Sequence, residues 1–144
     1  MTLVHGTCVD VGGTAVLLRG VSGSGKSDLA LRLIDEGARL IADDQVAVVA
    51  SGGALIATAP PAIAGQIEVR GVGLLAVPTA ASGRIGLVID LVAPQAIERL
   101  PRAEATEIAG VSVPRLALAP FEASAAAKVR LAASAAAAGM LGTS

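Results

Sequence analysis

The stretch GVSGSGKS at residues 20–27 decides the fold of this chain. It matches the phosphate-binding loop pattern G-x-x-x-x-G-K-[ST] at every fixed position. The apolar run TAVLLR precedes it and the segment DLALRLIDEG, whose leucines suit a mostly buried helix, follows it. The sequence therefore predicts a strand, a phosphate-binding loop and a helix, in the order that the motif requires.

Such a loop points backbone N–H groups into a cup at a helix N-terminus, where the helix dipole favours negative charge. Lys26 is expected to reach the β- and γ-phosphates of a nucleotide, and the Ser27 hydroxyl to coordinate magnesium. A flexible loop with an incidental lysine is the alternative, which the flanking strand and helix disfavour. The residues expected to bind the nucleotide are Gly20, Val21, Ser22, Gly23, Ser24, Gly25, Lys26 and Ser27.

Composition narrows the class of protein. A length of 144 residues predicts one domain spanning residues 1–144. The chain has 11 basic and 12 acidic residues, no basic run and a single aromatic residue, which argues against nucleic-acid binding. The uncharged stretch 46–67 is interrupted by glycines and by Pro60-Pro61, so no membrane span is predicted. The single cysteine, Cys8, and the lack of a secretory signal predict a cytoplasmic protein.

The remaining pattern predicts a mixture of strands and helices. Residues 4–11 and 14–18 are expected to form a hairpin that turns at Gly12-Gly13, and Gly37 is expected to end the helix that follows the loop. Residues 85–92 are apolar on both faces and predict a central strand. Further strands are expected at 39–42, 45–50 and 111–119, a strand that breaks into a loop at 67–77, and an alanine-rich helix at 123–138.

Asp43 and Asp44 follow the strand predicted at 39–42, at the edge where ligands bind in an open parallel sheet. One carboxylate could hold magnesium, as a Walker B aspartate does, and the other could accept a hydroxyl proton. Adjacent residues of a strand point to opposite faces, so both reach one site only if the strand ends between them. A solvated turn or a helix-capping pair is the alternative for these two residues.

Three more polar residues are candidates. Glu68 and Arg70 flank one residue, so on a strand both side chains point the same way, as a magnesium ligand and a phosphate-binding cation would. A surface ion pair is the alternative. His5, the only histidine, lies in an apolar strand, where a structural role is more common than a catalytic one.

The chain carries, in this order, the segments HGTCVDVGG, LLRGVSGSGKSDLALRLIDEGARLIADDQV and IEVRGVGLLAV. Together they resemble the catalytic domain of the HPr kinase/phosphorylase family. In that family a histidine-glycine strand, a phosphate loop, a helix ending in glycine, an Ala-Asp-Asp segment and an E-[IV]-R-G-[LIV]-G signature follow one another. The resemblance implies an α/β fold: a P-loop-containing mixed sheet with flanking helices, similar to phosphoenolpyruvate carboxykinase. It also implies assembly into hexamers.

The resemblance further implies a kinase that phosphorylates a serine of the phosphocarrier protein HPr with ATP or pyrophosphate and magnesium. It also implies reversal by phosphorolysis with inorganic phosphate, which yields pyrophosphate. Asp43 would be the general acid/base and His5 its partner, although Asp43 and Asp44 could exchange roles. The metal ligands would be Ser27, Asp44 and Glu68, and Arg70 would lie near the acceptor.

The sequence departs from the family pattern in three places. The usual N-terminal domain has no counterpart, so the resemblance is to a short form, and regulation through that domain is expected to be absent. The loop at 78–86 is compressed, and LALAPFEASAAAKVR replaces the usual P-V-x-x-G-R-N. We expect kinase activity to persist and phosphorolysis to be weaker, or to depend on Arg115, Lys128 or Arg130.

Two other functions fit the phosphate loop: another P-loop kinase, acting on a different protein or on a small-molecule hydroxyl, and a non-catalytic nucleotide sensor. A small-molecule kinase would need arginine-bearing lid segments, for which the chain offers few arginines beyond Arg84, Arg99 and Arg102. A non-catalytic nucleotide sensor would have no use for a proton acceptor such as Asp43.

Overall fold

The strand and helix that flank the glycine-rich loop form as the sequence predicts. In the computed structural model, which describes residues 1–141, β3 (Thr14–Arg19) leads into the loop and α1 (Lys26–Asp35) follows it. Helix α1 ends because Gly37 adopts a φ of 107°, which lets its N–H donate to the carbonyl of Ile34. Gly12-Gly13 likewise forms the predicted turn between β2 (Thr7–Val11) and β3.

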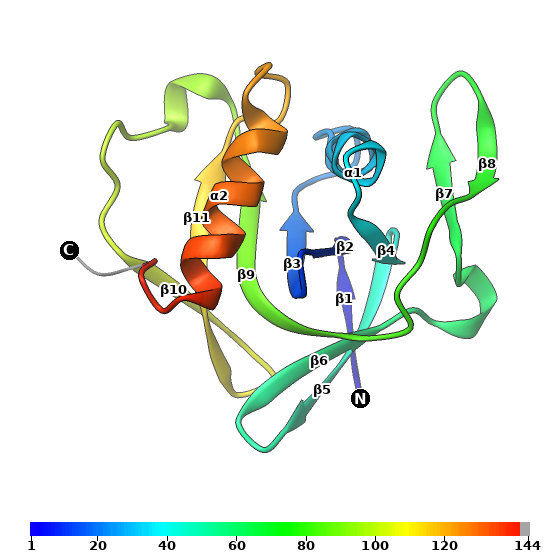
Figure 1. Cartoon of the computed structure of the whole chain (residues 1–144), viewed down its shortest axis with the longest axis horizontal. Coiled ribbons are helices and arrows are strands. Elements are labelled where there is room, and N and C mark those ends of the chain that lie inside the picture. The colour runs from blue at the N-terminus through cyan, green and yellow to red at the C-terminus, as the bar shows by residue number, and fades with distance from the viewer. Residues whose placement is uncertain (142–144) are drawn as a thin grey trace.

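Strand β3 lies inside a curled mixed sheet that has nine strands among the described residues (Figure 1). Seven of them follow the order β1-β5-β6-β9-β3-β2-β4, and β11 and then β10 branch from β9. Strand β9 runs parallel to β3 and to β11, and the other pairings in this sheet are antiparallel. The other strands of the sheet are β1 (Thr2–His5), β4 (Arg39–Ala42), β5 (Gln45–Ser51), β6 (Ala54–Thr58), β9 (Gly83–Leu91), β10 (Glu104–Ile108) and β11 (Val111–Leu118).

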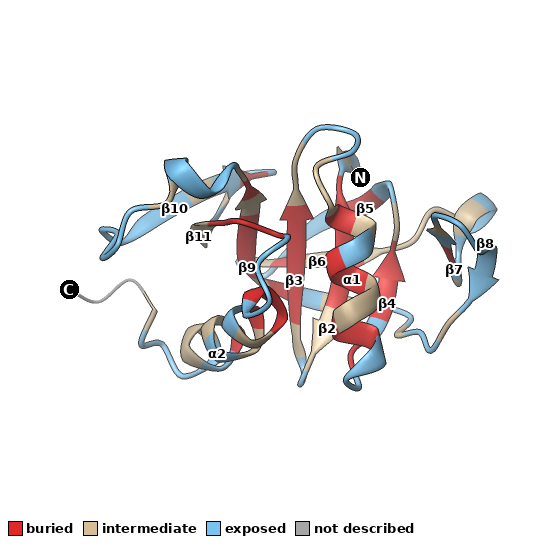
Figure 2. Ribbon diagram, turned by 90° about the horizontal axis from the view of Figure 1, so that it is seen from above, coloured by how far each residue is buried: buried red, intermediate tan, exposed pale blue. Residues whose placement is uncertain are grey.

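Two apolar cores lie on opposite faces of the central strands. Along β3, Val16 and Leu18 face the core beneath α1 and α2 (Ala125–Ala137), whereas Leu17 faces the core that the curl of the sheet encloses with β5 and β6. Figures 1 and 2 show both helices on the same side of the sheet, over strands whose residues are mostly buried. The central position predicted for β9 is confirmed, because Ile89 packs into the first core and Val88 into the second.

The predicted single strand at 4–11 is wrong, because the chain changes partner at Gly6. Strand β1 pairs with β5, and β2 pairs with β3 and β4. A Cβ at Gly6 would lie 2.7 Å from the carbonyl oxygen of Leu18, so only glycine allows this close approach.

Residues 67–77 also differ from the expectation. They form a separate antiparallel hairpin of β7 (Gln66–Val69) and β8 (Gly73–Ala76), not one strand that breaks into a loop. Strand β10 was not expected, because its charged sequence lacks alternation and it forms by pairing with β11 along its whole length. None of the helices within residues 1–141 combines the length and the hydropathy that crossing a membrane requires.

Candidate functional site

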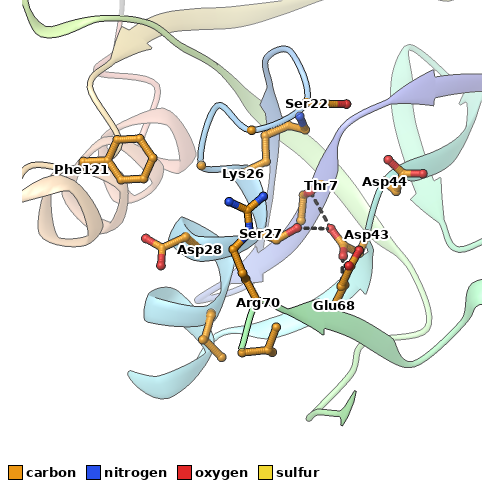
Figure 3. Close-up of a pocket in the computed structure, with 14 residues that line it drawn as sticks. Thr7, Ser22, Lys26, Ser27, Asp28, Asp43, Asp44, Glu68, Arg70 and Phe121 are labelled. Atoms are coloured by element: carbon orange, nitrogen blue, oxygen red, sulfur yellow. Dashed lines mark hydrogen bonds between the residues drawn. The ribbon is translucent and has the colours of Figure 1, made fainter. Parts of the chain in front are cut away.

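The phosphate-binding loop opens onto a pocket of about 470 Å³ (Figure 3). The residues expected from the sequence that line it are Ser22, Gly23, Gly25, Lys26, Ser27, Asp43, Asp44, Glu68 and Arg70. Four others, Gly20, Val21, Ser24 and His5, are not part of the lining. The structure therefore brings together segments from the loop, the end of β4 and the end of β7.

The topology explains why these segments meet. Strand β2 is antiparallel to both of its neighbours, β3 and β4, so its first residue lies at the edge where they end. The loop that follows β3, the Asp43-Asp44 pair that follows β4, and Thr7 at the start of β2 therefore share one edge. Asp43 and Asp44 follow the strand that the sequence predicted, although the pairings there are antiparallel and not parallel.

Lys26 is buried against the loop, with 7% of its surface exposed. Its Nζ donates to the carbonyl oxygens of Gly20 at 2.7 Å and Val21 at 3.0 Å. An ammonium group has three donors, so one remains for a ligand in the pocket. Gly20 and Val21 thus hold the lysine and do not themselves face the pocket.

Asp43 is the carboxylate that is hydrogen-bonded to the phosphate loop. Its Oδ1 accepts hydrogen bonds from the hydroxyls of Ser27 at 3.0 Å and Thr7 at 2.8 Å, and its Oδ2 lies 3.4 Å from the backbone nitrogen of Glu68. Thr7 is completely buried, so its hydroxyl fixes the carboxylate within the sheet edge. Sequence reasoning missed Thr7, because a threonine in a strand is ordinary and its partner lies 36 residues away.

Asp44 points away from Asp43 and pairs with His5. The His5 Nδ1 lies 3.7 Å from the Asp44 Oδ1, and these side chains are 52% and 76% exposed. Asp44 has a φ of 70°, which separates the two carboxylates because β4 has already ended at Ala42. The expected pairing of His5 with Asp43 is therefore corrected to a pairing with Asp44.

The β7–β8 hairpin supplies the opposite wall of the pocket. Glu68 and Arg70 both line it, as expected for two residues that point the same way. No ion pair joins them or engages either side chain elsewhere within residues 1–141, which removes the surface ion pair as an explanation. Figure 3 shows the Arg70 side chain among the residues that line the pocket.

Phe121 also lines the pocket, and sequence reasoning missed it. It is the single aromatic residue of the chain, and it lies against the phosphate loop at Gly25. The one feature of the sequence that could have indicated Phe121 is that the chain has no other aromatic residue of the Phe, Tyr or Trp type.

The three basic residues considered for phosphorolysis lie outside this pocket and have other partners. Lys128 pairs with Glu122, and Arg130 pairs with Glu36. Arg115 and Arg19 both bind Asp90. Partial burial raises the pKa of Asp90, but the hydrogen bonds from these two arginines outweigh it and hold the pKa below its usual value.

The donor atoms beside the loop fit magnesium. Within the described part of the chain, no three His, Cys, Asp or Glu side chains are grouped around a common metal position. Magnesium in a phosphate-loop protein needs fewer protein ligands, because phosphate oxygens and water complete its shell. The Ser27 hydroxyl and the carboxylates of Asp43, Asp44 and Glu68 all line the pocket and are hard oxygen donors of the required kind.

Comparison with known proteins decides the family. A family model described as the HPr Serine kinase C-terminal domain matches residues 1–140. The chain belongs to this family. The expected resemblance is thereby confirmed.

Individual relatives of the HPr serine kinase family agree. Over 74 residues the chain is 49% identical to HPr kinase/phosphorylase of Clostridium botulinum. This match covers 51% of this chain and 24% of the relative. The protein of the same name from Clostridium tetani is 47% identical over 78 residues, with coverages of 54% and 26%. The matched segment thus spans about a quarter of the curated relatives' length.

The fold is also that of the HPr serine kinase family. The structure of the Hpr(Ser) kinase/phosphatase from Coxiella burnetii superposes with a TM-score of 0.82 at 25% sequence identity. The match covers 91% of this chain and 93% of that one. The expected mixed sheet with flanking helices is therefore confirmed.

Proposed function

We propose that this domain is an ATP-dependent protein-serine kinase that phosphorylates an HPr-type phosphocarrier protein. The convergence of Lys26, Ser27 and Asp43 at one edge of the sheet carries the proposal, because these are the groups that phosphoryl transfer needs. The acceptor is inferred from the relatives, which are named for action on HPr.

In this proposal the loop binds the β- and γ-phosphates of ATP through its backbone N–H groups. Lys26 contributes the one donor that its two bonds to loop carbonyls leave over. Arg70 faces the same space and has no ion pair within residues 1–141, so we assign it to the transferred phosphoryl group. Pyrophosphate could occupy the same loop as an alternative donor.

The transfer step forms a bond between the acceptor serine oxygen and the γ-phosphorus. The bond from that phosphorus to the bridging oxygen of ADP breaks, and the serine proton passes to a carboxylate. We propose Asp43 as this carboxylate, with Thr7 and Ser27 holding its Oδ1. When bound, magnesium would neutralise charge on the phosphate oxygens, held by Ser27, Asp44 and Glu68.

A second assignment of the two aspartates is supported by specific contacts. Asp43 accepts the Ser27 hydroxyl, as a Walker B carboxylate next to a phosphate-loop serine does, and His5 lies beside Asp44. In that assignment Asp43 holds magnesium and Asp44 accepts the proton. The magnesium dependence of the variants, given in the Discussion, distinguishes the two.

The reverse reaction is part of the same proposal. An oxygen of inorganic phosphate would attack the phosphorus of phosphoserine, pyrophosphate would form, and the departing serine oxygen would recover its proton from the carboxylate. The three basic residues outside the pocket are occupied in ion pairs, so any phosphorolysis would use Lys26 and Arg70. Assembly into hexamers, a single domain over 1–144 and a cytoplasmic location remain predictions.

Transfer of labelled phosphate from ATP to a purified HPr-type protein tests the proposal, followed by a chase with inorganic phosphate. We expect magnesium-dependent labelling of a serine and its release as pyrophosphate. Lys26→Ala should abolish labelling. Lys128→Ala is the matched control, because Lys128 is the other lysine of the chain and pairs with Glu122 outside the pocket. Nucleotide binding without transfer to HPr would contradict the proposal.

A further inference from the structure

We propose that Phe121 is the platform on which the base of the bound nucleotide stacks, and that Arg32 positions it. This inference rests on the nucleotide-binding part of the proposed function and adds a subsite for the base.

The position of the ring is the first observation. Phe121 lines the pocket and is 71% exposed. A Cβ on Gly25 would lie 2.9 Å from its Cζ and 3.1 Å from its Cε1, so an edge of the ring rests on the phosphate loop itself. The rest of the ring is open to solvent, and a flat π surface beside a phosphate site is what a nucleobase uses for stacking.

The direction of the bound nucleotide is the second observation. Figure 3 shows Phe121 on one side of Lys26, and Asp43, Asp44 and Glu68 on the other. The reacting phosphate must face these carboxylates, because in the proposed function they accept the serine proton and hold the metal. The rest of the nucleotide therefore leaves the loop toward the opposite side, where Phe121 lies.

Arg32 of α1 holds the backbone on both sides of Phe121. Arg32 donates to the carbonyl oxygens of Pro120 and Glu122, the residues on either side of Phe121, and it also pairs with Asp28 on its own helix. Pro120 is buried and packs against Gly25. Because the backbone around Phe121 is already held, stacking needs little further ordering, which favours binding. Arg32 is thus a positioning residue that acts through Phe121.

Calorimetric binding of ATP and of tripolyphosphate, each with magnesium, tests the inference because only ATP carries a base. We expect Phe121→Ala to weaken ATP binding roughly tenfold and to leave tripolyphosphate binding unchanged. Phe121→Trp should retain ATP binding. Arg32→Gln should weaken ATP binding by a smaller factor, again without affecting tripolyphosphate.

Other outcomes would overturn it. Equal losses for ATP and tripolyphosphate would mean that Phe121 shapes the loop, and no loss for either would mean that the ring has no role in nucleotide binding. Phe121→Leu, which keeps apolar bulk, guards against a folding defect. Loss of transfer to HPr with unchanged ATP binding would assign the ring to the acceptor and reject the inference.

Failure of the proposed function is distinguishable. If the protein binds ATP in a Phe121-dependent way but transfers nothing to HPr, the proposed function fails and the base platform stands. If HPr is phosphorylated and Phe121→Ala binds ATP normally, the platform fails and the kinase stands.

Discussion

The Ser27 hydroxyl donates a hydrogen bond to Oδ1 of Asp43 over 3.0 Å. This contact joins the first turn of α1 to the end of β4, two segments that are 16 residues apart in the chain. It places the Asp43 carboxylate beside the loop that would bind phosphate.

The two aspartates should respond differently to loss of charge. We expect Asp43→Asn to lower phosphate transfer by on the order of 10² to 10⁴, the usual contribution of a general base, without changing the magnesium concentration required. Asp44→Asn should raise that concentration. Single-turnover transfer across a magnesium titration measures both effects. If Asp43→Asn raises the required magnesium concentration and Asp44→Asn does not, Asp43 is the metal ligand and Asp44 is the proton acceptor.

Thr7 should affect the rate through Asp43. Thr7→Val keeps the shape of this buried side chain but removes the hydroxyl that donates to Asp43 at 2.8 Å. We expect transfer to fall about tenfold, because the Asp43 carboxylate loses one of the two hydroxyls that hold its Oδ1. Thr7→Ser keeps the hydroxyl and should restore transfer. Full transfer activity in folded Thr7→Val would show that the hydroxyl only fills space.

Gly6→Ala should impair the site by steric conflict. The φ of Gly6 is not in the left-handed region, so the backbone conformation itself tolerates alanine. The new Cβ, however, would lie 2.7 Å from the Leu18 carbonyl oxygen and would displace the adjacent Thr7. We expect transfer to fall more than about tenfold. Gly12→Ala is the control, because it adds strain at a φ of 60° with nothing within 4 Å.

Both glycine variants should lose about 1 kcal/mol or more in urea denaturation, since each distorts the backbone. Only Gly6→Ala should lose activity beyond its loss of folded protein. Full transfer activity in folded Gly6→Ala would contradict the importance of this close approach.

Asp90 should make stability depend on pH. Its folded pKa is lowered by Arg19 and Arg115, so its stabilisation is fully present above the unfolded value of about 3.9 and is lost as pH falls through the folded pKa. Asp90→Asn should therefore reduce the free energy of unfolding by about 1 to 3 kcal/mol at pH 7, and the difference from wild type should vanish in strong acid.

Urea denaturation at several pH values measures this effect. Glu122→Gln, which removes an exposed ion pair with Lys128, should change stability by less than about 1 kcal/mol and serves as the control. A loss for Asp90→Asn that persists unchanged at low pH would refute the electrostatic explanation.

The sequence predicted what local pattern determines. The loop, the end of α1 at Gly37 and the central position of β9 follow from motif, backbone freedom and two apolar faces. The partner exchange at Gly6 depends on contacts between distant segments, which periodicity does not record, because β1 pairs with β5. Strand β10 pairs with the next strand, β11, in a hairpin, but its charged sequence lacks the alternation that indicates a strand.

The site shows the same division. The lysine and the serine were identifiable because the phosphate-loop motif fixes their positions, and the aspartates because they follow the next predicted strand. Which residues contact Asp43 and which contact Asp44 could not be predicted from the sequence. These contacts depend on the φ of 70° at Asp44 and on the buried hydroxyl of Thr7. Phe121 reaches the loop only through the path of the chain after β11.

The position of Phe121 also has a spectroscopic consequence. The chain contains no tryptophan and no tyrosine, so the protein has almost no intrinsic near-ultraviolet fluorescence. A tryptophan introduced by Phe121→Trp would be the sole emitter of the molecule, located against the phosphate loop. Its emission would report nucleotide arrival directly, without a labelled ligand and without background from the rest of the fold.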